Sequence, residues 1–212
     1  VSGAVCGGAG IYNHPNAVMT ISDSIFFHNI ADCSGGGLFN EGTVTITHTV
    51  FRDNDGGFEG EGGALFNNYG GTMTVVNSSF IGNLGRINGG AIHNHATLTV
   101  RNSSFTGNYA GDDCPTCNPP LTASGGTISN FPGTLIIENS TISTNSGGGV
   151  VSAGTATLAN STVVFNTPKL FGGIANNAGN TFNIRNSIIG GNGTGTGGAD
   201  LYGVFTSQGY NI

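Results

Sequence analysis

The chain of 212 residues has only five lysine and arginine residues, six prolines and no tryptophan, and charged residues make up 8% of it. So few basic side chains cannot neutralise many phosphates, which argues against a nucleic-acid partner. No apolar run reaches the roughly 18 residues that a transmembrane helix needs. Glycine does not recur at every third position, which excludes collagen. The low net charge and substantial apolar content also argue against intrinsic disorder.

What the chain does contain is 39 glycines, a hydrophobic fraction of 37% and four cysteines. Such an apolar fraction without tryptophan favours a narrow, regular core. Cysteines in an acidic, glycine-rich chain are typical of an oxidising, extracellular setting. The first residues show no signal-peptide pattern and no initial methionine, so we interpret the chain as a mature or excised segment.

A block of 13 residues occurs seven times without internal gaps. Each copy opens with apolar residues at alternate positions, usually with threonine between them, which indicates a strand with one buried face. A shorter block, as in GGALFN and GGAIHN, precedes most copies. The seven copies span residues 17–29, 42–54, 71–83, 96–108, 133–145, 154–166 and 180–192.

A repeat period of about 25 residues with short strands is typical of a parallel β-helix. One coil, meaning one full turn of that helix, cannot bury its own apolar face, whereas coils stacked about 4.8 Å apart share a continuous core. The sequence therefore predicts an all-β fold, a right-handed, single-stranded parallel β-helix (solenoid) of about seven coils. We expect a single domain over residues 1–212, an insertion loop at 109–124 and an irregular C-terminal coil at 193–212.

The last residue of every copy is asparagine. Side-chain amides in successive coils can hydrogen-bond to one another along the stack, and asparagine tolerates tight turns. We therefore predict a structural asparagine ladder made of Asn29, Asn54, Asn83, Asn108, Asn145, Asn166 and Asn192.

The spacing of the cysteines agrees with the predicted stacking of the coils. Cys6 and Cys33 each lie seven residues before the asparagine of the shorter block, so they should stack in adjacent coils within disulfide reach. Cys114 and Cys117 form a CPTC motif within the insertion loop, where a small local disulfide is favoured. A metal site there would need ligands from elsewhere, and a thioredoxin-like role would need a βαβ context.

Two motifs recur in tandem: GGA followed by an apolar residue, at 62–65 and 89–92, and F-x-x-N, at 26–29, 51–54, 80–83 and 105–108. Together they resemble the repeat of the polymorphic outer-membrane protein family and of related bacterial surface β-helix proteins. The resemblance covers nearly the whole chain and is strongest over residues 7–110. It implies a secreted or surface-displayed β-helix, often adhesive, with no catalytic residues to transfer.

One acidic segment is a candidate calcium site. Asp53, Asp55, Glu59 and Glu61 lie within nine residues, separated by glycines that permit tight turns. Carboxylate oxygens are the ligands that Ca²⁺ prefers. The alternative is a solvated acidic loop without an ion, and no other cofactor is expected.

A second candidate is an aromatic column formed by Tyr12, Phe39, Phe66 and His93, each just after the buried aliphatic residue of the shorter block. Strict alternation places these side chains outward, and an exposed aromatic stripe would be a contact surface for a sugar, a protein or another rod. The alternative is that a bend turns them inward or that a loop covers them.

Two further function classes are compatible with the sequence. Threonine columns such as Thr43/Thr45, Thr72/Thr74 and Thr97/Thr99 could order water as ice-binding surfaces do, although threonine is also a common exposed strand residue. Parallel β-helices also include polysaccharide lyases and hydrolases. A hydrolase needs two or three carboxylates at a fixed separation. The only clustered acids lie in the 53–61 loop, with no basic or aromatic groove nearby, and His93 and His95, on the same side, lack an acid or nucleophile.

The sequence thus favours a non-enzymatic structural or adhesive rod at the cell surface or outside the cell, one that could stack end to end into filaments. Its expected partners are other copies of itself, or a host or matrix surface of protein or glycan. The alternatives are a polysaccharide-active lyase or hydrolase and an ice-binding protein.

Overall fold

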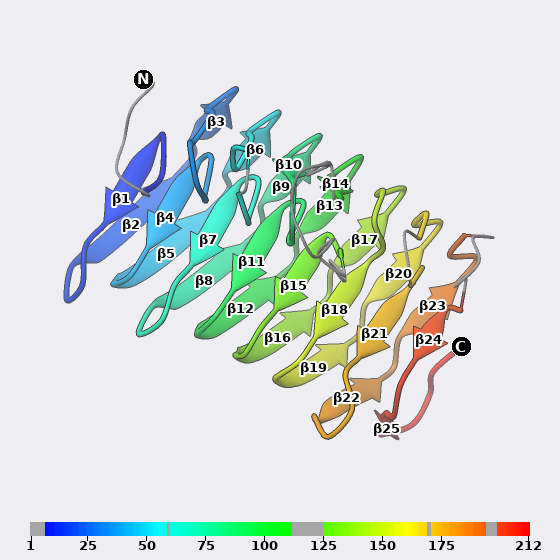
Figure 1. Cartoon of the computed structure of the whole chain (residues 1–212). Helices are drawn as coiled ribbons and strands as arrows, with labels where there is room; N and C mark the ends of the chain where they lie inside the picture. The colour runs from blue at the N-terminus through cyan, green and yellow to red at the C-terminus, as the bar shows by residue number, and fades with distance from the viewer. Residues whose placement is uncertain (1–6, 59, 112–124, 169–170, 194–198) are drawn as a thin grey trace.

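The computed structural model describes residues 7–58, 60–111, 125–168, 171–193 and 199–212. This part of the chain is all-β, and every strand pairing in it is parallel. The coils stack in chain order from the N-terminus to the C-terminus, as Figure 1 shows. The chain is therefore a parallel β-helix of about seven coils, and the predicted fold class is confirmed. The described residues contain no helix that could cross a membrane.

Three strands from each coil contribute to three stacked sheets. The first sheet has eight strands: β1 (Ile11–Asn13), β4 (Leu38–Asn40), β7 (Leu65–Asn67), β11 (Ile92–Asn94), β15 (Ile128–Asn130), β18 (Val150–Ser152), β21 (Ile174–Asn176) and β24 (Leu201–Tyr202). The second also has eight: β2 (Val18–Ser22), β5 (Thr43–Thr47), β8 (Thr72–Val76), β12 (Thr97–Arg101), β16 (Thr134–Glu138), β19 (Thr155–Ala159), β22 (Phe182–Arg185) and β25 (Thr206–Ser207).

The third sheet has seven strands: β3 (Ile25–Phe27), β6 (Val50–Arg52), β9 (Ser79–Ile81), β13 (Ser104–Thr106), β17 (Thr141–Ser143), β20 (Thr162–Val164) and β23 (Ile188–Gly190). Short strands β10 (Leu84–Gly85) and β14 (Tyr109–Ala110) pair separately. The second and third sheets come from the 13-residue block, and the first sheet comes from the shorter block. Each repeat unit of the sequence is therefore one coil of the helix.

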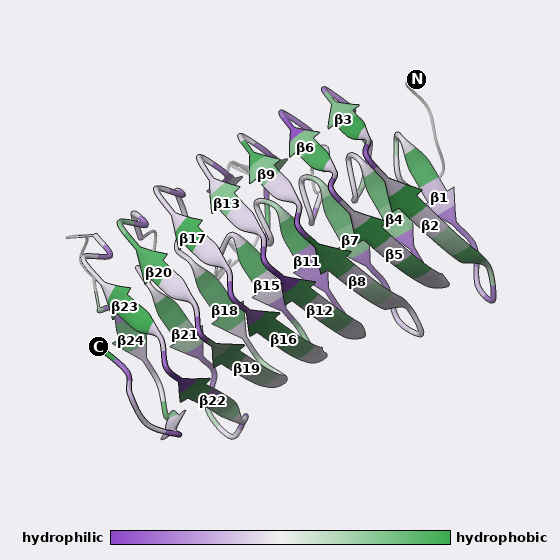
Figure 2. Ribbon diagram, turned by 180° about the vertical axis from the view of Figure 1, so that it is seen from behind, coloured by the Kyte–Doolittle hydropathy of each residue, from purple (hydrophilic) through white to green (hydrophobic). Residues whose placement is uncertain are grey.

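The core runs along the axis as columns of like side chains. In the third sheet the rings of Phe26, Phe51, Phe80 and Phe105 stack with centroids 4.7, 5.0 and 4.6 Å apart. These separations match the usual spacing of neighbouring strands, because identical positions lie directly above one another. Apolar residues concentrate in the strands, as the hydropathy colours of Figure 2 show. Each fully buried side chain contributes about 1.5–3 kcal/mol by leaving water.

The asparagines that end the 13-residue blocks form an unbroken chain of side-chain hydrogen bonds. From Asn29 to Asn192 each amide donates to the amide oxygen of the next coil over 2.8–3.0 Å. The last amide donates to the carboxylate of Asp200 over 2.9 Å. Because these asparagines are buried from Asn54 onward, the ladder satisfies polar groups that no water reaches.

Two more polar ladders were not predicted from the sequence. The asparagines at the ends of β1, β4, β7, β11 and β15 are linked over 2.7–2.8 Å, and the series ends on the hydroxyl of Ser152. Between the second and third sheets, serine hydroxyls accept hydrogen bonds from the backbone of the preceding coil. These serines are Ser78, Ser103, Ser140, Ser161 and Ser187.

Left-handed turns connect the second sheet to the third. Asn77, Asn102, Asn139 and Asn160 have φ of 50°, 50°, 49° and 51°. Asparagine is among the few non-glycine residues that adopt this conformation at low cost. The same left-handed turn is made by Asp23 and His48 in the first two coils and by Asn186 in the last block, so the bend recurs in every 13-residue block.

Two of the predicted boundaries fall partly in regular structure. Residues 193–212 were expected to be irregular, but β24 and β25 lie there and pair with β21 and β22. The expected insertion loop at 109–124 opens with β14, which pairs with β10, and its residues 112–124 lie outside the described part. The helical stack thus extends by a partial coil beyond the last 13-residue block.

Candidate functional site

The predicted aromatic column exists, but it is largely buried. Strand pairing aligns Tyr12 with Phe39, Phe39 with Phe66, and Phe66 with His93. Tyr12 is 38% exposed, whereas Phe39, Phe66 and His93 are 7%, 5% and 1% exposed. The expectation of a solvent-exposed stripe is therefore wrong for three of the four residues. Alternation along a strand sets which side of the sheet a residue faces, but not what packs over that side.

The side chains of the column stack on one another, and one of them hydrogen-bonds to a neighbouring acid. The ring of Phe66 stacks on those of Phe39 and His93, with centroids 4.9 and 5.3 Å apart. The hydroxyl of Tyr12 donates to the carboxylate of Glu41. That hydrogen bond is the main reason that the pKa of Tyr12 is raised.

A compact group of ionisable side chains lies where this column meets β11. His93 is the middle residue of β11, and His95 is the first residue after that strand ends. Glu61 comes from the preceding coil, immediately before Gly62 and Gly63. Ligand-type atoms of Glu61, His93 and His95 all lie within 4.8 Å of one another. This group, here called the Glu–His–His cluster, is the candidate functional site.

The two imidazoles of the cluster face each other. The Nε2 atoms of His93 and His95 are 2.6 Å apart, and His93 Nε2 is 3.6 Å from Glu61 Oε2. At 2.6 Å the two Nε2 atoms form a hydrogen bond, in which one Nε2 carries the proton and donates while the other accepts. The Nδ1 atoms of both histidines are buried and have no hydrogen-bond partner in the described structure.

Neighbouring side chains hold the cluster in place. Asn88 donates its side-chain N–H to Glu61 Oε1 over 2.8 Å, which leaves Oε2 directed at His93. The backbone N–H of His95 donates to the carbonyl of Asn67 over 2.8 Å, so the turn after β11 is anchored to the coil below. The ring of Tyr69 lies 4.6 Å from that of His95.

Burial controls the charge state of the cluster. It lowers the pKa of His93 well below the ordinary value, and the adjacent imidazole of His95 adds to this effect. Burial also lowers the pKa of His95 and raises that of Glu61, although the hydrogen bond from Asn88 partly offsets the change at the carboxyl. The imidazoles are therefore held neutral at neutral pH.

The sequence carried a signal for part of this cluster. The segments EGGALFN (61–67) and NGGAIHN (88–94) align without gaps. This alignment stacks Glu61 beside Asn88 and Phe66 beside His93. The approach of Glu61 to the two histidines does not follow from the alignment, because the acid and the imidazoles occupy different positions of the repeat.

The predicted calcium loop does not assemble within the described part of the chain. The Asp55 carboxylate pairs with Arg86 over 3.0 Å and accepts the Gly57 N–H over 2.8 Å. Asp53 lies 3.6 Å from Arg52, and Glu61 belongs to the Glu–His–His cluster. Glu59 lies outside the described residues. The three described carboxylates thus have separate partners, and calcium binding at them stays a prediction.

The cysteine predictions fall mostly outside the described residues, because Cys6, Cys114 and Cys117 are not among them. Cys33 is not a free thiol. The Cys6–Cys33 and Cys114–Cys117 pairings stay predictions.

One further charged group lies on the outer face of the second sheet. The guanidinium of Arg101 donates to Glu138 over 2.8 Å, and Arg185 lies 3.7 Å from the other oxygen of that carboxylate. All three side chains are partly exposed, and such pairs stabilise a protein by only about 0–1 kcal/mol. Glu138 therefore contacts both arginines on this face.

No protein-family model matches the chain, and no curated protein or solved structure matches it significantly.

Proposed function

We propose that this chain is a non-enzymatic structural or adhesive rod that acts outside the cell or on its surface. The observation that carries the proposal is the uninterrupted stacking of like side chains along the axis. An apolar core and three internal polar ladders run through successive coils, so each coil is fixed by its neighbours. Such an arrangement resists local opening, which suits a spacer or scaffold exposed to proteases.

The proposal includes association between copies of the chain, for which the sheet edges give support. Among the described strands, β1, β2 and β3 form one edge of the three stacked sheets, and β24, β25 and β23 form the other. Edge strands of this kind offer backbone groups for pairing with another strand. We propose a second copy of the chain as the partner, because its opposite edge carries parallel strands of the same three-sheet cross-section.

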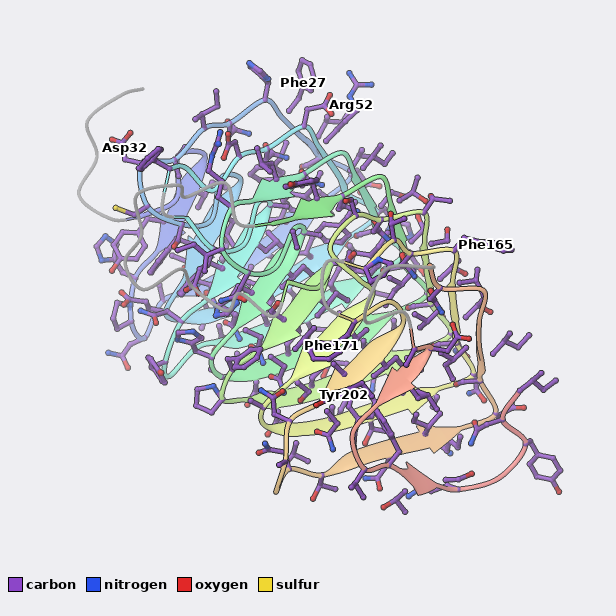
Figure 3. All side chains as sticks on the ribbon, turned by 45° about the vertical axis from the view of Figure 1, so that its right-hand side comes forward. Phe27, Asp32, Arg52, Phe165, Phe171 and Tyr202 are labelled. Carbon is purple, nitrogen blue, oxygen red and sulfur yellow. The ribbon has the colours of Figure 1, made fainter. Side chains whose placement is uncertain are left out.

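Apolar exposure is also concentrated at the two end coils. In the first coil Val18, Ile25 and Phe27 are 80%, 73% and 52% exposed. In the last coil Tyr210 and Ile212 are 91% and 85% exposed. A pocket of about 400 Å³ opens there between core positions of the last full coil and the final segment. Figure 3 shows Tyr202, at this end, beside Phe171, and their rings stack with centroids 4.2 Å apart.

Sedimentation velocity over a concentration series, with electron microscopy of the same samples, tests this association. We expect concentration-dependent particles that lengthen along one axis. Tyr210→Asn should weaken the association, whereas Phe165→Asn should not. Both residues are exposed aromatics with φ of 56°, but Phe165 lies in a turn within the stack (Figure 3). Monomers at every concentration, or equal effects of the two variants, would contradict end-to-end association.

A specific observation also favours ice binding as a second candidate function. The exposed threonines Thr43, Thr72, Thr97, Thr134 and Thr155 form one continuous outward column of the second sheet. A second column, two residues along each strand, holds Thr20, Thr45, Thr74 and Thr99 before Ile136 interrupts it. Parallel strands place these hydroxyls on a lattice of about 4.8 by 6.6 Å.

Thermal hysteresis measured with the purified chain tests this second candidate. If the threonine columns bind ice, freezing should occur below the melting point, and Thr72→Tyr should abolish the gap. Thr141→Tyr, at an exposed position of the third sheet, is the matched control and should leave the gap unchanged. Absence of any gap would remove ice binding and leave the rod proposal intact.

A further inference from the structure

We infer that the Glu–His–His cluster binds a divalent transition-metal ion of the Zn²⁺ type, through Glu61 Oε2, His93 Nε2 and His95 Nε2. This site is separate from the rod function. It shares Glu61 with the acidic segment that the sequence suggested for calcium, but its other two ligands are histidines of the next coil.

The atoms already lie close to ligand geometry. Zn–N and Zn–O bonds of about 2.0–2.2 Å at tetrahedral angles place two ligand atoms about 3.4 Å apart. His93 Nε2 and Glu61 Oε2 are 3.6 Å apart, so this pair needs almost no adjustment. The two Nε2 atoms, 2.6 Å apart, must separate by under about 1 Å. His95 is half-buried and follows the end of β11, so a small shift of its side chain would supply this separation.

The donor types select the class of metal. Two imidazole nitrogens and one carboxylate oxygen suit Zn²⁺, Cu²⁺, Ni²⁺ or Co²⁺, whereas Ca²⁺ and Mg²⁺ prefer oxygen donors throughout. Three protein ligands leave a fourth position for water or another ligand, as in open zinc sites.

The charges at the cluster also fit a cation. The carboxylate of Glu61 is three-quarters buried, and within the described part of the chain no lysine or arginine pairs with it. Arg86, in the next coil, is already paired with Asp55. A bound dication would balance the carboxylate. It would take an Nε2 lone pair from each imidazole once the ring that carries its proton on Nε2 has moved that proton to Nδ1.

Asn88 acts as a positioning residue for this site. Its amide N–H holds Glu61 Oε1 and thereby turns Oε2 toward His93. Partners of this kind around a metal ligand typically change metal affinity by about 10–100-fold. Asn88→Ala should therefore weaken binding without abolishing it.

The test uses the whole chain without a histidine tag, stripped with EDTA and exchanged into metal-free buffer. Titration with ZnCl₂ in a calorimeter should show saturable binding of one equivalent. Titration with CoCl₂ should produce visible d–d absorption bands from nitrogen-ligated Co²⁺. CaCl₂ should give neither signal at the cluster, and a calcium signal that survives loss of the histidines would be assigned to the acidic loop.

Three variants decide whether the cluster is responsible. His95→Gln and Glu61→Gln should each weaken Zn²⁺ binding by at least about 100-fold, because loss of a direct ligand exceeds loss of an outer partner. His28→Asn is the matched control, since His28 is an exposed histidine with φ of 54° that asparagine tolerates. It should bind Zn²⁺ like the parent chain. Far-UV circular dichroism shows whether each variant keeps its strand content.

Two outcomes overturn the inference. One is the absence of saturable Zn²⁺ binding and of Co²⁺ bands in the folded parent chain. The other is a folded His95→Gln variant that binds Zn²⁺ as tightly as the parent. Neither outcome affects the rod proposal, which is tested by association.

Discussion

The same asparagine-to-alanine substitution should cost very different amounts of stability at two positions of one ladder. Asn83 lies in the interior and makes four side-chain hydrogen bonds: two accepted from Asn54, and one donated to each of Asn108 and the carbonyl of Phe51. Asn29, at the end of the ladder, donates a single one, to Asn54.

Asn83→Ala leaves two buried N–H groups of Asn54 without an acceptor. Each unsatisfied buried group costs about 1–3 kcal/mol, so the free energy of unfolding should fall by about 2–6 kcal/mol. In Asn29→Ala the acceptor on Asn54 still receives the backbone N–H of residue 29, so no buried group is left unpaired. The expected loss there is about 1 kcal/mol or less.

Urea unfolding followed by far-UV circular dichroism at 25 °C measures both values. Domains of this size are stable by about 5–15 kcal/mol, so Asn83→Ala should lower the midpoint greatly and Asn29→Ala only slightly. Equal losses at the two positions would refute the argument that the ladder acts by satisfying buried donors. A loss below about 1 kcal/mol at Asn83 would refute it as well.

Three other predictions concern the core, the cluster and a turn. Phe80→Ala should cost about 3–5 kcal/mol because Phe80 is fully buried between two stacked rings, whereas the 58% exposed Phe58 should tolerate alanine within about 0.5 kcal/mol in the same unfolding assay. Because the pKa of His93 is lowered in the folded chain, the imidazole takes up a proton at higher pH in the unfolded chain than in the folded one. In EDTA the free energy of unfolding should therefore keep its full value above about pH 6.5 and should fall as the pH drops below it. His93→Phe should reduce that slope, and an unchanged slope would show that other groups cause it. Gly89→Ala should destabilise more than Gly70→Ala in thermal melts, because both have positive φ but only the first places its Cβ against backbone; equal melting temperatures would contradict this.

The sequence predicted the stacked helix because the same 13-residue block recurs without gaps. A repeated block forces each side chain to meet its counterpart in the next coil. The phenylalanines of β6, β9 and β13 and the asparagines after them were identifiable for that reason. The second asparagine ladder could have been found by the same argument, since Asn13, Asn40 and Asn67 end the shorter block.

The candidate site was harder to predict, because it depends on positions where the repeat varies. Glu61 occupies the place of Asn88, and His93 the place of Phe66, so neither belongs to a column of identical residues. Period-two alternation put His93 on the outer side of β11, and that side is buried, so its exposure could not be inferred from the pattern.

By itself, then, the sequence determined the coil, the register and the core columns of this protein, because these follow from a local pattern repeated at a fixed period. Only the tertiary structure decided which outward side chains are covered and which variable residues meet. Those outcomes depend on contacts between coils at positions where the repeat varies. The contact between Glu61 and the two histidines, 32 and 34 residues further along the chain, is of this kind.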